Sequence, residues 1–239
     1  MPGLLALLVL GFFLGLRHAT DPDHVIAVTT IVAREKTPSG ATAIGAAWGI
    51  GHMVTILIVG GGIILFGWVI PPKVGLAMEF FVGLMLIVLG LMNLRTRTHS
   101  HEHALDANSD GVERPPVKWL DRHFGALRSY RLVRPLVVGV VHGLAGSAAI
   151  ALLVLTTIRN PVSAIWYLLV FGTGTIVGMM LMTAVIIVPF KSTNQRFPRL
   201  QGRLRMASGV VSLAFGLFIA YRAGMVDGLF SGNPHWTPE

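Results

Sequence analysis

The stretch RHATDPDHV, from Arg17 to Val25, interrupts two apolar segments and decides how the chain folds. It places two histidines, two aspartates and a proline between residues 4–16 and 25–32, which are mostly apolar. A charged side chain near the centre of a bilayer costs about 2.5–3.5 kcal/mol on insertion scales, so such residues persist where they line a polar cavity. Pro22 has no backbone N–H and opposes a regular helix. We therefore expect a broken helix whose freed backbone groups line a polar site inside a membrane.

The polar residues of this stretch form a metal-binding donor set. His18, Asp21, Asp23 and His24 supply two imidazoles and two carboxylates within seven residues, which suits Ni²⁺, Co²⁺ or Zn²⁺. In a regular helix the two histidines would lie about 600° apart, so only a break brings them onto one site. Asp23 is expected to be a ligand or to orient one. Asp21 is a secondary candidate and, by its spacing, the expected partner of Arg17.

The composition is that of a polytopic membrane protein. Of 239 residues, 53% are hydrophobic and 13% are charged, and the mean hydropathy is +0.69. Soluble domains carry about 25% charged residues. The sequence thus predicts an all-α fold forming a single transmembrane domain over residues 1–239. The chain has no cysteine, which excludes disulfides, thiolate metal sites and thiol–disulfide electron transfer within it.

Six membrane spans of about 20 residues or more can be recognised. The predicted spans are 3–33 (containing the break), 42–69, 74–94, 133–158, 161–189 and 206–226. Residues 95–131 form a long polar loop that separates the third span from the fourth. Its composition predicts poor order.

The basic residues predict the orientation of these spans. Of the 19 Lys and Arg, 15 lie in or beside the connections after the first, third and fifth spans. Three others, Lys73, Arg159 and Arg222, lie on the opposite side, and Arg17 lies within the first span. The positive-inside rule then places those three connections in the cytoplasm and both termini outside a cytoplasmic (inner) membrane. The net charge of +8 therefore reflects topology, and no nucleic-acid partner is expected.

The two halves of the chain resemble each other. Residues 15–18 match 139–142 at an offset of 124, and 48–52 match 171–175 at an offset of 123. Gly83 and Gly90 match Gly209 and Gly216 at an offset of 126. A weak alignment between glycine-rich helices is the alternative explanation. We expect two inverted three-helix repeats, at about 1–94 and 132–228, because an odd number of spans per repeat inverts the second.

Other histidines extend the expected site. His52 and His142 lie in apolar spans and would approach from the second and fourth helices, His52 as a ligand and His142 as a secondary candidate. In the polar loop, His99, His101 and His103 form the sequence HSHEH, which suits an exposed metal chelator but also an ordinary solvated loop.

The motif His18-x4-Asp23-His24, with the sequence HATDPDHV, resembles the His-x4-Asp-His signature of the nickel/cobalt transporter (NiCoT) family. A second family signature resembles residues 50–55, which contain His52. The six-span length is similar to the short members described as urease-accessory membrane proteins. The resemblance implies that His18, Asp23, His24 and His52 select and move the metal.

The expected function is secondary transport of Ni²⁺ and/or Co²⁺, with the ion as substrate and no resident cofactor or enzymatic activity. The expected partners are the divalent ion and the lipid bilayer, and a homo-oligomer is left open. One alternative is a membrane-embedded metalloenzyme, although no HExxH sequence occurs. Another is an anion or amino-acid exporter with related repeats, in which Arg17 binds the substrate.

Overall fold

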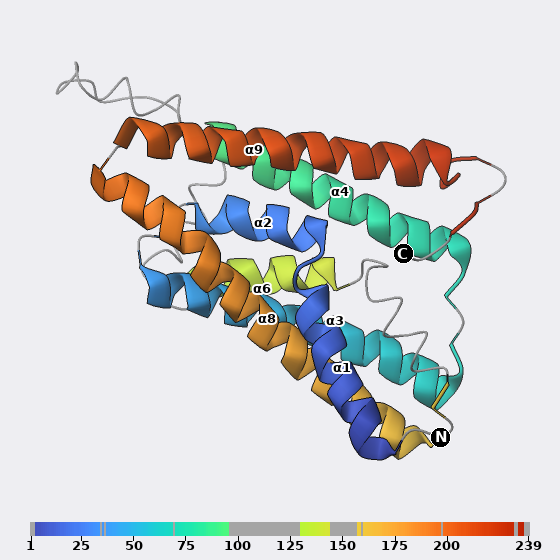
Figure 1. Ribbon diagram of the computed structural model, residues 1–239. Coiled ribbons are helices and arrows are strands. Elements are labelled where there is room, and N and C mark those ends of the chain that lie inside the picture. The colour runs from blue at the N-terminus through green and yellow to red at the C-terminus, as the bar shows by residue number, and fades with distance from the viewer. Residues whose placement is uncertain are drawn as a thin grey trace.

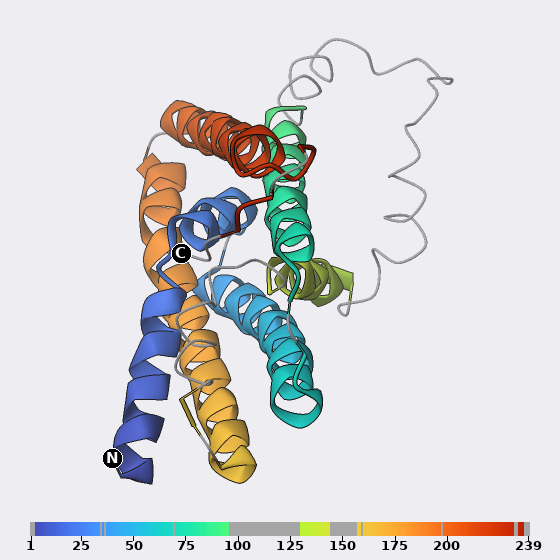
Figure 2. The same ribbon diagram turned by 90° about the vertical axis from the view of Figure 1, so that its right-hand side faces the viewer.

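The computed structural model describes residues 3–33, 35, 37–68, 70–95, 130–143, 157–158, 160–196, 198–231 and 234–236, in which the chain is helical without strands. The α-helices are α1 (Leu4–His18), α2 (Pro22–Val32), α3 (Pro38–Phe66), α4 (Pro72–Arg95), α6 (Tyr130–His142), α8 (Pro161–Arg196) and α9 (Pro198–Tyr221), and the π-helix is η3 (Arg222–Val226). Figures 1 and 2 show α4 and α9 side by side on one side of the molecule and α1, α3, α6 and α8 on the other. The short helix α2 lies between these two groups.

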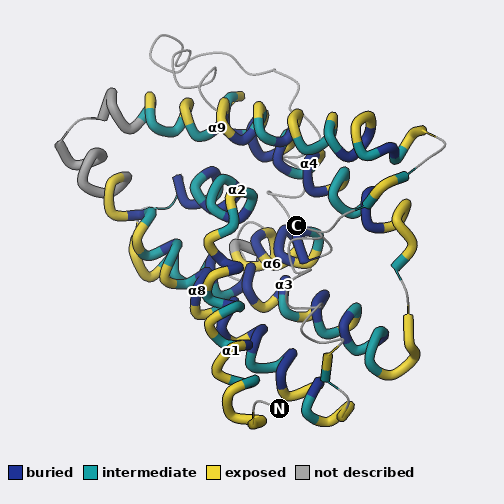
Figure 3. The backbone as a smooth tube through the Cα atoms, turned by 45° about the vertical axis from the view of Figure 1, so that its right-hand side comes forward, coloured by how far each residue is buried: buried dark blue, intermediate teal, exposed yellow. Residues whose placement is uncertain are grey.

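Four helical stretches are long and apolar enough to cross a membrane: Pro38–Phe66, Pro72–Arg95, Pro161–Pro189 and Gly202–Val226. The bent pair α1 and α2 brings the number to five if it forms one span. The chain is therefore a multi-pass α-helical membrane protein. Exposed residues lie mainly on the outward sides of the helices and buried residues on the sides facing other helices (Figure 3).

Helix α3, which corresponds to the second predicted span, starts and ends earlier than predicted. Thr37 caps α3 by accepting a hydrogen bond from the N–H of Gly40, and Pro38 occupies the first helical position. The helix ends at Phe66 because Gly67 adopts a left-handed conformation with φ 63°, which glycine tolerates without strain. The predicted limits, 42–69, missed these two caps.

The chain changes direction between α1 and α2, whose axes are bent by 56°. Asp21 is extended, and Pro22 begins α2 at the position where a missing N–H costs least. The N–H groups of Thr20 and Asp21 donate to the carbonyls of Arg17 and His18 at 2.8 and 3.1 Å. The turn thus satisfies part of its own backbone, as apolar surroundings require.

The predicted fourth span is only partly described. Helix α6 begins at Tyr130, contains Pro135 and ends at His142, and its apolar part from Leu132 is too short to cross a membrane alone. Residues 144–156, which would complete this span, lie outside the described residues. So do residues 96–129, which include most of the predicted loop and the histidines at positions 99, 101 and 103.

Several helices meet backbone to backbone at glycines. A Cβ atom on Gly15 of α1 would overlap the carbonyl oxygen of Phe171 in α8. In the same way, a Cβ atom on Gly139 of α6 would overlap the carbonyl oxygen of Trp48 in α3. The two contacts are related by the internal repeat: Gly15 corresponds to Gly139 at an offset of 124, and Trp48 corresponds to Phe171 at an offset of 123. A second pair of contacts is related in the same way: a Cβ atom on Gly174 would overlap the carbonyl oxygen of Phe12, and one on Gly51 would overlap that of Leu136.

The helix α2 is held by apolar contacts. Its residues Ala27, Val28 and Val32 are almost completely buried and belong to the same core cluster as Trp48 and Leu86. Close packing is what joins helices in a bilayer, where the surrounding lipid is as apolar as the side chains. This core packs α2 against its neighbours, and its first turn places His24 beside Trp48 of α3 and His142 of α6.

Candidate metal centre

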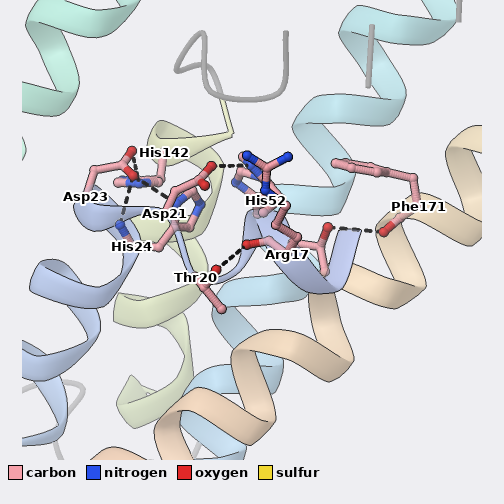
Figure 4. Close-up of polar contacts among 10 residues, drawn as sticks. Arg17, Thr20, Asp21, Asp23, His24, His52, His142 and Phe171 are labelled. Atoms are coloured by element: carbon pink, nitrogen blue, oxygen red, sulfur yellow. Dashed lines mark hydrogen bonds and ion pairs between the residues drawn. The ribbon is translucent and has the colours of Figure 1, made fainter. Parts of the chain in front are cut away.

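Four imidazoles from four helices converge at the break, and Figure 4 labels three of them, His24, His52 and His142. His18 is the last residue of α1, His24 lies in the first turn of α2, His52 lies within α3, and His142 ends α6. His18 is 5% exposed and the other three are fully buried. The structure therefore places all four histidines of the apolar segments at one location.

A first group of ligands consists of His18, His24 and His52, whose ligand atoms lie within 4.8 Å of one another. The ring centroids are 4.6 Å apart for His18 and His24, 4.9 Å for His18 and His52, and 5.1 Å for His24 and His52. A metal bound at about 2.1 Å would hold neighbouring nitrogens about 3.0–3.4 Å apart. Adjustments of about 1 Å therefore bring all three rings onto one ion.

Asp21 orients His18. Nδ1 of His18 lies 2.8 Å from Oδ2 of Asp21, and a carboxylate can only accept, so this nitrogen carries the proton. Nε2 of neutral His18 is then an acceptor, and it lies 2.8 Å from Nε2 of His52, which donates. The expected pairing of Asp21 with Arg17 is wrong, because Asp21 contacts His18 and Arg17 is exposed.

Asp23 orients His24 in the same way. Nδ1 of His24 lies 3.1 Å from Oδ1 of Asp23, which also accepts the backbone N–H of His24 at 3.0 Å. Nε2 of His24 is buried without a hydrogen-bond partner, as is Nδ1 of His52. Buried polar atoms normally have partners, so these nitrogens are available to bind an ion or water. Carboxylate–histidine pairs with a free second nitrogen are typical of metal sites.

A second group of ligands consists of Asp23, His24 and His142, again within 4.8 Å of one another. Nε2 of His142 lies 2.9 Å from Oδ2 of Asp23, but the two atoms are not aligned as a hydrogen bond, and both ring nitrogens of His142 lack one. The Asp23 side chain is 13% exposed. Asp23 therefore belongs to the second group of ligands, with His24 and His142, and not to the first.

Two aromatic residues around the imidazoles were not anticipated. The ring of Trp48 stacks 6.1 Å from that of His24 and meets His142 edge-on at 5.5 Å. Phe171 lies 5.7 Å from His18. The sequence held a signal for both: Trp48 is four residues before His52, on the same helix face, and it corresponds to Phe171 in the internal match.

The fold and this cluster define a polytopic helical membrane protein with a histidine-rich polar centre. Residues 25–218 match the family model described as the cytochrome c biogenesis protein transmembrane region, and the chain belongs to that family. It contains no cysteine, so it has no thiol chemistry of its own.

Curated relatives are similar over most of the chain. The urease accessory protein UreH of Bacillus sp. (strain TB-90) is 36% identical over 227 residues, which cover 95% of this chain and 96% of UreH. This match confirms the resemblance to urease-accessory membrane proteins. Two chloroplast proteins of Arabidopsis thaliana, FOR GROWTH AND FERTILITY 2 and 1, are 27% and 26% identical. Each alignment covers 87% of this chain but only 54% and 57% of those proteins. No solved structure shows a significant match.

Proposed function

We propose that this protein is a secondary transporter that moves Ni²⁺ and/or Co²⁺ across the cytoplasmic membrane. The observation that carries the proposal is the first ligand group, His18, His24 and His52, which is buried among membrane-spanning helices and holds unpartnered ring nitrogens. Imidazole is a preferred ligand of both ions. Ionisable groups at membrane depth commonly mark ion pathways.

The similarity to UreH supports a role connected with metal supply, because that protein is named for an accessory function to urease. The NiCoT-like motif of residues 18–24 supports the same substrate class. In this proposal His18, His24 and His52 bind the ion, Asp23 is a ligand or orients one, and Asp21 and His142 assist. The histidines at positions 99, 101 and 103 capture metal outside the membrane-spanning part.

We further propose six spans arranged as two inverted repeats, with α1 and α2 as one broken span and residues 133–158 as the fourth. The corresponding glycine contacts, Gly15 with Phe171 and Gly139 with Trp48, support this arrangement because they relate one helix pair to the other. The distribution of Lys and Arg supports cytoplasmic connections and external termini. Alternating access of the two repeats around the histidines would then carry the ion.

Metal flux into proteoliposomes tests the proposal. Vesicles containing the full chain and a trapped fluorescent chelator should accumulate Ni²⁺ or Co²⁺, and vesicles containing His24→Ala should not. His235→Ala, which changes an exposed histidine of the C-terminal segment, should match the wild type. Wild-type vesicles no more permeable to either ion than empty vesicles would contradict the proposed function.

A further inference from the structure

We propose that the transported ion occupies two overlapping positions in turn and that His24 passes it from one to the other. In the first position the ligands are His18, His24 and His52; in the second they are Asp23, His24 and His142. This inference rests on the proposed function, but it concerns how many ions the centre holds and which side chains bind at each stage.

The geometry places His24 between the two sets of ligands. Its ring centroid lies 4.6 and 5.1 Å from those of His18 and His52, and 4.2 Å from that of His142. The rings of His52 and His142 are 6.4 Å apart, farther than any pair within the first group. An ion that leaves His52 for His142 can therefore remain bound to His24 throughout.

The second position has the features of a built site. His142 is fully buried, and neither of its ring nitrogens has a hydrogen-bond partner. Its Nε2 lies 2.9 Å from Oδ2 of Asp23 without hydrogen-bond alignment. That separation is close to the spacing of about 3.0 Å between adjacent ligand atoms on one metal ion. A cation bound by both atoms would satisfy the carboxylate oxygen and the buried nitrogen together.

The two positions exclude each other. His24 has one unpartnered nitrogen, Nε2, because Asp23 holds Nδ1, so it binds one ion at a time. Two divalent cations in so small a buried space would also repel each other strongly. The centre therefore holds a single ion, whose ligands change from three neutral imidazoles to two imidazoles and a carboxylate.

Co²⁺ is a suitable probe, because its X-ray absorption spectrum reports the ligand atoms. The full-length wild type should bind one Co²⁺ per chain. His142→Ala should still bind one, with nitrogen ligands typical of imidazole, and His52→Ala should bind one with a carboxylate oxygen. Each variant should transport Co²⁺ at least about tenfold more slowly than the wild type, because each lacks a ligand of one of the two positions that the ion occupies in turn. The double variant should bind none, and His235→Ala should behave as wild type.

Three results would overturn the proposed transfer of the ion by His24. They are two Co²⁺ bound per wild-type chain, transport by His142→Ala at the wild-type rate, or no Co²⁺ bound by His52→Ala. Thermal unfolding of each variant identifies a folding defect, and His142→Gln and His52→Gln replace any alanine variant that has one. Lack of transport by the wild type contradicts the proposed function as a whole. If the wild type does transport the ion and any of the three results is found, only the proposed transfer of the ion by His24 is contradicted.

Discussion

Replacing His24 with asparagine should abolish most metal binding while preserving the local fold. The amide nitrogen of asparagine occupies about the place of Nδ1, so it can still donate to Oδ1 of Asp23, as the imidazole does at 3.1 Å. The substitution removes Nε2, the nitrogen that has no partner within the protein. Of the two ring nitrogens, only the one free to bind an ion is thereby lost.

The size of the effect follows from the place of His24 in both ligand groups. Losing an outer-shell partner of a metal site costs 10–100-fold in affinity, so losing a ligand shared by both groups should cost at least about 100-fold, or about 2.7 kcal/mol. Calorimetry with Ni²⁺ on the purified wild type and His24→Asn measures this difference. His235→Asn makes the same change at an exposed histidine and should leave the affinity unchanged. If His24→Asn binds Ni²⁺ within about threefold of the wild type, the buried imidazoles are not its ligands.

Four further predictions concern the orienting carboxylate, protons, topology and the polar loop. Asp21→Asn removes the charge that holds His18 and should weaken Ni²⁺ binding about 10–100-fold in the same titration, whereas an unchanged affinity would show that His18 needs no such partner. Ni²⁺ affinity should fall as the pH is lowered from 8 to 5, because protons compete for imidazole nitrogens; a flat profile over this range, measured by calorimetry, would argue against histidine ligands. A reporter fused after Glu239 should be active only outside the cytoplasm, and activity confined to the cytoplasm would refute the predicted topology. Deletion of residues 99–103 should reduce uptake at low metal concentration but not at saturation; complete loss in a correctly inserted protein would give this loop a larger role than metal capture.

The sequence was most informative where its pattern was interrupted. The polar residues and Pro22 within an apolar stretch predicted a broken helix there; α1 and α2 are bent by 56° next to these residues, and their assignment to one span remains a proposal. Four histidines in apolar segments could be assigned to one site, because burying a polar side chain at membrane depth costs free energy unless the side chain finds partners in a polar centre. These arguments needed only local sequence and the cost of burying polar groups.

Partners within the centre were less predictable, because they depend on rotation about the break. Spacing alone paired Asp21 with Arg17, whereas the turn directs Asp21 to His18. Nor did spacing show that Asp23 reaches His142, which lies more than a hundred residues away. The helix ends at Thr37 and Gly67 were missed for a different reason, since the hydropathy pattern used to set the limits does not register caps.

The glycine contacts also distinguish α2 from the helices around it. Backbone contacts at glycines join α1 to α8, α8 to α3 and α3 to α6, so His18, His52 and His142 lie on helices whose backbones pack directly against one another. The eleven-residue helix α2 contains no glycine and is held by side chains instead. A small tilt of α2 would displace His24 and Asp23 relative to the other three imidazoles without breaking any of these glycine contacts. If the proposed transport occurs, substitutions in its apolar face, at Ala27 or Val28, would therefore alter the rate of ion movement without changing a proposed ligand.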